Sequence, residues 1–256
     1  MNWAHAVALG IVEGLTEFLP VSSTGHLILT SGLLGLPQTE FLKSFEISIQ
    51  VGAILAVVLV YWRSFFRRPA VLARVLTALA PTLVVGFFLY TLIRQSLFSN
   101  EGLILWSLLI GGVVLILFDL WHKESPDSVE DISSISYPRC FLIGLAQAVS
   151  VVPGVSRAGA TILGGLALNL KRRTIVEFSF LLAAPTILAA TALDLVKNRE
   201  AFAGTDWGLL ALGAAVSFAV ALVVIKFFIR YIQRHGFLIF GFYRIAAAAA
   251  FWMFAR

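Results

Sequence analysis

The chain has 256 residues, of which 59% are hydrophobic and only 13% are charged, and its net charge is +5. A soluble domain cannot bury this much apolar side chain, so the composition excludes a soluble globular protein and predicts an integral membrane protein. The basic excess then indicates membrane topology, and we expect no nucleic-acid partner. A single cysteine, Cys140, excludes a disulfide framework within the chain.

The first apolar region, residues 4–36, is interrupted by proline and hydroxyl residues, which predicts two half-length helices that enter and leave the membrane on one side. Three runs follow that are long enough to cross the bilayer, which takes about 20 residues. An acidic, serine-rich segment at 122–137 is predicted to be a solvated connector, and a second interrupted region lies at 139–169. The six full spans are predicted at residues 45–62, 72–93, 102–121, 175–194, 207–229 and 237–255.

The two interrupted regions are related in sequence. A shift of 134 residues aligns several small and polar residues: Gly10 with Gly144, Glu13 with Gln147, Ser22 with Ser156 and Gly25 with Gly159. Three spans lie between the two regions, and an odd number reverses the side from which the second one enters. We therefore expect an all-α polytopic membrane protein, one domain over 1–256, with six transmembrane helices and two re-entrant hairpins in inverted repeats at about 1–121 and 138–256.

The positions of lysine and arginine predict the orientation. The loops on one side of the predicted spans collect twelve of these residues and the loops on the other side collect five. Basic loops stay in the cytoplasm. Both termini, and a site reached from the first hairpin, are therefore predicted to face the outside of a plasma membrane.

Glu13 and Glu17 are four residues apart, so both carboxylates lie on one face of a helix. Two like charges at membrane depth need a compensating partner, which is a divalent metal ion, Arg157 or a shared proton. A structural hydrogen-bonded pair is the alternative reading.

The segment Pro20-Val-Ser-Ser-Thr-Gly-His26 is typical of a helix break followed by a new helix start. The free amides of a helix N-terminus suit an anionic phosphate, although the three hydroxyls can also be simple caps. His26 follows Ser23 by three residues, a spacing at which the imidazole can accept the proton of a serine nucleophile. A purely structural histidine is the competing interpretation.

The segment Pro153-Gly-Val-Ser-Arg-Ala-Gly-Ala-Thr161 repeats this design and adds an arginine. A guanidinium offers the planar fork of donors that captures phosphate in a bidentate way. Elsewhere, Glu46 and Gln50 are predicted either to line the cavity or to hydrogen-bond between helices, whereas Asp119, Glu177, Asp194 and Arg244 are predicted to be structural anchors near span ends.

These motifs, together with Phe45-Glu-Ile-Ser-Ile-Gln50, closely resemble the bacterial undecaprenyl-diphosphate phosphatase family, also called the bacitracin-resistance phosphatases. The resemblance implies hydrolysis of the terminal phosphate of a polyprenyl diphosphate lipid, which supplies undecaprenyl phosphate for cell-wall synthesis, with a divalent cation (magnesium or calcium) as cofactor. Relatives commonly have Ser-Arg-Ser-Gly where this chain has Ser156-Arg-Ala158-Gly, so that second hydroxyl has no role here.

The predicted mechanism has Ser23 attack the terminal phosphorus while His26 takes its proton, although a histidine nucleophile remains open. The predicted catalytic residues are Ser23, His26, Arg157 and Glu17; the predicted metal ligands are Glu13 and Glu17; the predicted substrate-binding residues are Ser22, Thr24, Gly25, Gly154, Ser156, Thr161 and Gln50. A polyprenyl-lipid translocator or transporter is the alternative function, because inverted hairpins are also typical of transporters. Membrane lipid and a second copy of the chain, as a homo-oligomer, are the other predicted partners.

Overall fold

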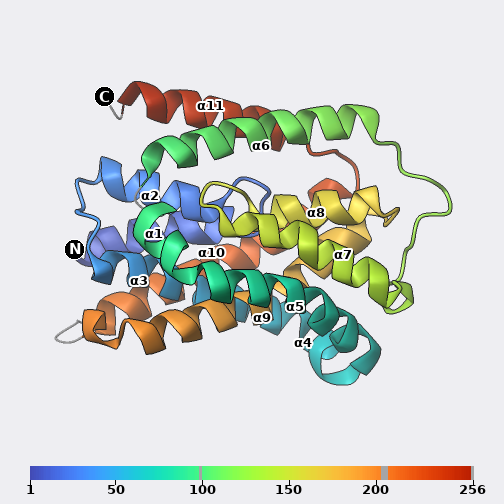
Figure 1. The fold of residues 1–256 in the computed structure, drawn as a ribbon, viewed down its shortest axis with the longest axis horizontal. Coiled ribbons are helices and arrows are strands. Elements are labelled where there is room, and N and C mark those ends of the chain that lie inside the picture. The colour runs from blue at the N-terminus through green and yellow to red at the C-terminus, as the bar shows by residue number, and fades with distance from the viewer. Residues whose placement is uncertain (98–99, 203–206, 255–256) are drawn as a thin grey trace.

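The computed structural model describes residues 1–97, 100–202 and 207–254. They form a bundle of α-helices that run mostly along the long axis of the molecule (Figure 1). The chain is a polytopic membrane protein, because several of these helices are both long and apolar enough to cross a bilayer.

Within the described residues, five spans meet that length and composition. The first joins α3 (Glu40–Ser48) to α4 (Gln50–Arg67), and the second joins α5 (Pro69–Leu92) to the π-helix η1 (Ile93–Leu97). The others are α6 (Glu101–Trp121), α9 (Arg172–Lys197) and α10 (Trp207–Ile232). The expected sixth span forms α11 (Leu238–Phe254), which at 17 residues belongs with the shorter apolar helices, and residue 255 lies outside the described part.

Each of the two interrupted regions forms a pair of helices joined by a turn. The first consists of α1 (Trp3–Thr16) and α2 (Ser23–Leu33), and the second consists of α7 (Tyr137–Ala148), the short 3-10 helix η3 (Val149–Val151) and α8 (Arg157–Ala167). Figure 1 shows that the first hairpin opens toward the end that carries the N-terminus, whereas the second opens toward the opposite end. Their turns therefore meet in the middle of the bundle.

Each hairpin packs against a helix from the other half of the chain, α1 against α10 and α7 against α5. Glycines permit this close approach: a Cβ atom on Gly10 would lie 2.6 Å from the carbonyl oxygen of Gly213, and one on Gly144 would lie 2.0 Å from that of Ala78. Small residues at such crossings let helix backbones touch, which drives association inside a membrane. The hairpins are thus fixed by backbone contact.

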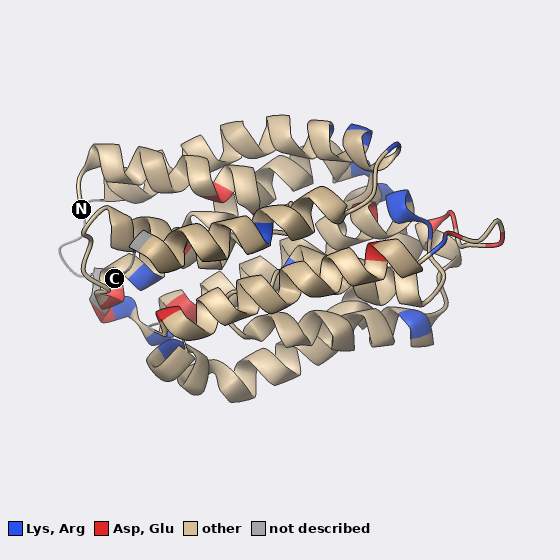
Figure 2. Ribbon diagram, turned by 90° about the horizontal axis from the view of Figure 1, so that it is seen from above, with Lys and Arg blue, Asp and Glu red and all other residues tan. Residues whose placement is uncertain are grey.

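The core lies between α4, α8, α9 and α10, where Phe18, Phe180 and Phe228 are fully buried. The outer faces of the helices carry large apolar side chains, such as Phe88 and Trp121, that are mostly exposed. Charged residues gather instead at the ends of the bundle, with most of the lysines and arginines at the end opposite the N-terminus (Figure 2). There the 122–136 connector contains η2 (Ile132–Ser134) and pairs with the segment that follows α8 through a bridge between Val129 and Leu170.

Candidate active site

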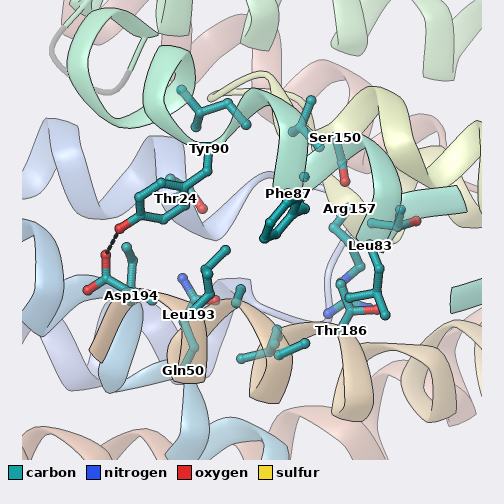
Figure 3. A pocket seen from close by; sticks show the side chains of 18 of the residues that line it. Thr24, Gln50, Leu83, Phe87, Tyr90, Ser150, Arg157, Thr186, Leu193 and Asp194 are labelled. Atoms are coloured by element: carbon teal, nitrogen blue, oxygen red, sulfur yellow. Dashed lines mark hydrogen bonds between the residues drawn. The ribbon is translucent and has the colours of Figure 1, made fainter. Parts of the chain in front are cut away.

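A cavity of about 660 Å³ opens where the two hairpin turns face α5 and α9. Figure 3 shows Thr24 and Arg157 approaching it from the two hairpins, opposite Phe87 and Tyr90 of α5 and Thr186 and Leu193 of α9. The structure brings the following predicted site residues to its wall: Glu17, Ser22, Ser23, Thr24, Gln50, Ser156 and Arg157. Residues more than a hundred positions apart in the sequence therefore share one chamber.

Both hairpins present a capped helix N-terminus to this cavity. The Ser22 hydroxyl accepts a hydrogen bond from the Gly25 amide at 3.4 Å, and the Ser156 hydroxyl accepts one from the Gly159 amide at 3.0 Å. Ser22 holds a left-handed backbone conformation (φ 73°), which is uncommon and strained for a residue with a side chain. Both serines therefore cap their helices, and the two helix N-termini, which carry the positive ends of the helix dipoles, lie at the same cavity.

Glu17, at the C-terminal end of α1, joins the two hairpins. Its Oε1 atom accepts a hydrogen bond from Arg157 Nη2 at 2.6 Å, and its Oε2 atom accepts one from the Ser23 hydroxyl. Arg157 Nη1 donates in addition to the carbonyl oxygen of Ser179 on α9 at 3.0 Å. One buried carboxylate thus holds a hydroxyl from the first hairpin beside a guanidinium from the second.

His26 differs from the expectation that it accepts the Ser23 proton. Its Nδ1 atom lies 2.8 Å from the carbonyl oxygen of Ser22, and its Nε2 atom lies 2.9 Å from the hydroxyl of Tyr243 on α11. The Tyr243 ring also stacks on the imidazole, with ring centroids 5.5 Å apart. Because both ring nitrogens are occupied, Ser23 is paired with Glu17 instead, and Tyr243 is a contact that sequence spacing gave no means to find.

Glu13 is fully buried and does not line the cavity, and neither of its carboxylate oxygens has a hydrogen-bond partner in the part of the chain that the structure describes. Glu46 is similarly buried, and among the described residues it neither lines the cavity nor forms the interhelical hydrogen bond that was the alternative, whereas Gln50 does line the cavity. Within the described residues no group of three or more histidine, cysteine or acidic side chains is arranged to hold a metal ion. The protein offers unpaired carboxylate oxygens next to Glu17, but fewer than a complete set of ligands.

Gln147 occupies the position in the second hairpin that Glu13 occupies in the first. Its side-chain amide donates to the hydroxyls of Thr82 at 3.0 Å and Thr186 at 3.2 Å, and its carbonyl oxygen accepts from Thr161 at 3.1 Å. Thr161 also donates to the carbonyl oxygen of Arg157 at 2.8 Å. Thr161 therefore lies behind the cavity wall, in a network that supports the arginine.

Gly25 and Gly154 also lie behind the wall, at the point where the two turns touch. A Cβ atom on Gly25 would lie 3.5 Å from the Cα atom of Gly154. Gly154 has φ +89° and leaves no room for a side chain, because a Cβ atom there would lie 2.7 Å from the carbonyl oxygen of Ile104. These glycines bring the two turns together and do not themselves line the chamber.

A buried ion pair closes the end of the cavity nearest the N-terminus. Arg94 of η1 binds Asp194 of α9 and also lies 2.8 Å from the Glu40 carboxylate. The Tyr90 hydroxyl donates to Asp194 at 3.0 Å, as the dashed line in Figure 3 shows, and Asn198 donates to the same carboxylate at 3.0 Å. Asp194 is thus an anchor, as predicted, but it also forms part of the cavity wall.

Residues 6–250 match the family described as bacitracin resistance protein BacA. The chain belongs to this family. It is 46% identical over 253 residues to the undecaprenyl-diphosphatase of Aquifex aeolicus (strain VF5), with 98% of each chain covered. It is 49% identical over 253 residues to that of Sulfurihydrogenibium sp. (strain YO3AOP1), with 99% of each chain covered. The chain therefore covers 98% and 99% of the length of these two relatives.

Proposed function

We propose that this protein is a membrane phosphatase that removes the terminal phosphate of undecaprenyl diphosphate and leaves undecaprenyl phosphate in the membrane. The observation that carries the proposal is the single carboxylate of Glu17, which holds the Ser23 hydroxyl and the Arg157 guanidinium together in one cavity. A nucleophile, an acceptor for its proton and a phosphate-binding cation are the parts that phosphoryl transfer requires. The choice of undecaprenyl diphosphate as the substrate follows from the relatives, which are undecaprenyl-diphosphatases.

The diphosphate is held by positive groups from both hairpins. The α2 and α8 helices both begin at the cavity, so the unbonded amides of their first turns and their dipoles favour an anion there. Arg157 adds a full charge and a fork of donors, and its Nε atom is buried without a partner. These groups also stabilise the negative charge on the phosphoryl oxygens as the reaction proceeds.

Ser23 attacks the terminal phosphorus from this position. Its oxygen forms a bond to phosphorus, the anhydride bond breaks, and the polyprenyl monophosphate leaves with its bridging oxygen. Glu17 is the acceptor for the serine proton, because the hydroxyl already donates to it. Water then hydrolyses the phosphoserine and releases inorganic phosphate. His26 holds the backbone turn before Ser23 through its bond to the Ser22 carbonyl.

A divalent cation fits the residues that remain. Magnesium is typically bound by one or two carboxylates and completes its shell with water and substrate phosphate oxygens. Glu13 has two buried, unpaired oxygens and lies against Glu17, so these two residues are the proposed ligands. When bound, the ion would neutralise charge on the diphosphate.

The apolar wall of the cavity suits the lipid tail. Leu83, Val84, Phe87 and Phe88 of α5 line the chamber and are also among the exposed side chains on the outer surface. A polyprenyl chain can therefore extend from the site along α5 into the bilayer while its headgroup stays between the hairpins.

We further infer that the hairpins are re-entrant and that the two halves are inverted repeats. The opposite directions in which the hairpins open support this topology, as does the exchange by which each hairpin packs on the other half (Figure 1). The end of the bundle that is rich in lysine and arginine is proposed to face the cytoplasm (Figure 2). The mouth closed by Arg94 and Asp194 then faces outward.

The test measures phosphate release from undecaprenyl diphosphate by the purified protein in detergent, where no compartment exists for a transporter to fill. Wild-type protein should release phosphate, and Ser23→Ala should lower turnover by about 10³-fold or more because the nucleophile is lost. Ser133→Ala, on the exposed connector, is the matched control. If Ser23→Ala keeps near-normal turnover while His26→Ala is inactive, histidine is the nucleophile and this mechanism is wrong.

A further inference from the structure

Arg244 lies in the middle of α11, where its side chain is only 2% exposed. All of its hydrogen bonds go to backbone carbonyl oxygens. Two of these carbonyl oxygens belong to α6: Nη2 donates to that of Ser107 at 2.8 Å and Nε donates to that of Leu108 at 3.2 Å. The other two come from the hairpin turns: Nη1 donates to Pro20 at 3.2 Å and Nη2 donates to Gly154 at 3.0 Å.

Pro20 and Gly154 are equivalent positions of the two hairpins. Each lies two residues before a capping serine, Ser22 in the first turn and Ser156 in the second. The same shift of 134 residues that aligns the two motifs also aligns these two positions. One guanidinium thus bridges the matching points of both turns, although it belongs to neither hairpin.

This arrangement lowers the stability of the fold. Arg244 forms no ion pair with any carboxylate of the described residues, and an unpaired charge inside a protein loses much of its hydration free energy. The carbonyl dipoles offset only part of that loss. An apolar side chain would hold α11 against α6 without losing any hydration free energy of a charge. The position is therefore poorly explained by helix packing alone.

The neighbouring helix is shaped to receive the side chain. A Cβ atom on Gly111 of α6 would lie 2.2 Å from Arg244 Nη2, and one on Gly112 would lie 3.1 Å from Arg244 Cβ. These adjacent glycines leave a slot that the guanidinium fills. The contact with α6 consequently fixes the direction in which the guanidinium points, which is toward the turns.

We propose that Arg244 is a positioning residue of the phosphatase reaction: by binding the carbonyls of Pro20 and Gly154 it sets the distance between the two hairpin turns, and hence between Ser23 and Arg157. This inference rests on the proposed function. Arg244 does not line the cavity, so it acts through the backbone of the turns and not on the substrate itself. It was predicted from the sequence to be an anchor near a span end, and the structure places it behind the two hairpin turns, in contact with both.

The first test is Arg244→Lys, which keeps the charge but replaces the planar fork with a single ammonium that cannot reach carbonyls of both turns and of α6 together. Displacing reacting groups by about 1 Å can cost about 10²-fold in rate, so we expect kcat/KM for undecaprenyl diphosphate to fall by about 30-fold or more. Both hairpins bind the diphosphate, so KM should rise as well as kcat fall. Arg172→Lys, at the connector end of α9, is the matched control.

A second variant perturbs the same contact without touching Arg244. Gly111→Ala places a methyl group where the guanidinium lies, and it should shift KM and kcat in the same direction as Arg244→Lys. Because both changes act through one contact, the double variant should lose much less than the product of the two single losses. Gly102→Ala on the same helix, where a Cβ atom would make only an ordinary contact at 3.5 Å, should be unaffected.

A merely structural role gives a different result. Loss of folded protein lowers the apparent kcat in proportion to the folded fraction, measured by size-exclusion chromatography, and leaves KM unchanged. That pattern, or unchanged kinetics in Arg244→Lys and Gly111→Ala, overturns the inference. Absence of phosphate release by the wild-type protein would instead refute the proposed function, so the two failures are distinguishable.

Discussion

The two hairpins share a backbone plan but have different interiors. Both place a serine-capped helix N-terminus at the cavity, yet Gln147 in the second hairpin has hydrogen-bond partners for its whole side-chain amide, whereas Glu13 at the matching position of the first has none among the described residues. A buried polar group without a partner destabilises a fold, and this difference is the reason we propose Glu13 as a cation ligand. In the second hairpin, the hydrogen-bond network of Gln147 and Thr161 supports Arg157.

The largest expected effect comes from removing the charge that the second hairpin presents. Arg157→Gln should lower turnover by about 10³-fold, because the donor that binds the phosphoryl oxygens is lost and Glu17 loses its partner. Phosphate release in detergent measures the loss, and thermal unfolding shows whether the variant stays folded. A folded Arg157→Gln protein with more than a tenth of wild-type activity would contradict this role.

Glu13→Gln makes the first hairpin resemble the second and so tests the difference directly. We expect activity to fall by about 10- to 100-fold and the response to magnesium to weaken, because an amide is a poorer cation ligand than a carboxylate. Activity is measured across a magnesium titration after chelation. Glu101→Gln, at the exposed start of α6, is the control, and an unaltered magnesium dependence in Glu13→Gln would exclude Glu13 as a ligand.

The converse change, Gln147→Glu, removes the donor to the Thr82 and Thr186 hydroxyls and buries a carboxylate in its place. It should lower the free energy of unfolding by about 1 to 3 kcal/mol, because buried groups lose their partners. Thermal unfolding in detergent gives the comparison with Gln233→Glu, an exposed control. Equal stability of the two variants would show that the network does not support the second hairpin.

Tyr243→Phe tests the contact that fixes His26. The ring stacking is kept and one hydrogen bond is lost, so we expect activity to fall by about 3- to 10-fold, which corresponds to one ordinary hydrogen bond. Steady-state kinetics is measured for both Tyr243→Phe and His26→Ala, so that the two losses of activity can be compared. A loss as large as that of His26→Ala would mean that the tyrosine hydroxyl itself takes part in the reaction.

The smallest effect concerns the open end of the second hairpin, where Lys171 lies 2.6 Å from Glu130 on the connector. The hydrogen bond from Lys171 holds the pKa of Glu130 below its usual value, and its partner raises the pKa of Lys171. Any stability that the Glu130 carboxylate contributes is therefore present above its pKa in the unfolded chain and is lost as pH falls through its lowered pKa in the folded protein. Any stability that Lys171 contributes is lost only as pH rises through its raised pKa in the folded protein. The pair is exposed, so Glu130→Gln should leave the melting temperature unchanged at neutral pH. A clear drop there would give the connector a structural role.

The sequence was sufficient for the features that depend on local composition. Apolar runs located the spans to within a few residues, as for α6, because crossing hydrocarbon demands a fixed length of apolar helix. Pro20 and Ser22 located the first helix break, because proline and a capping hydroxyl act within one turn. The polar residues that meet at the cavity were also identifiable, since charges and hydroxyls at membrane depth are rare.

The pairing of those residues depends on how the helices pack, which the sequence pattern does not reveal. Spacing favoured His26 as the partner of Ser23, but Tyr243 arrives from 217 positions away to occupy the imidazole and leaves the serine to Glu17. Arg244 reaches Pro20 across 224 positions, and nothing periodic in the sequence could reveal it. Helix periodicity reports which face a residue occupies, whereas a hydrogen bond depends on which helices pack together, and that is set by the backbone contacts of the whole bundle.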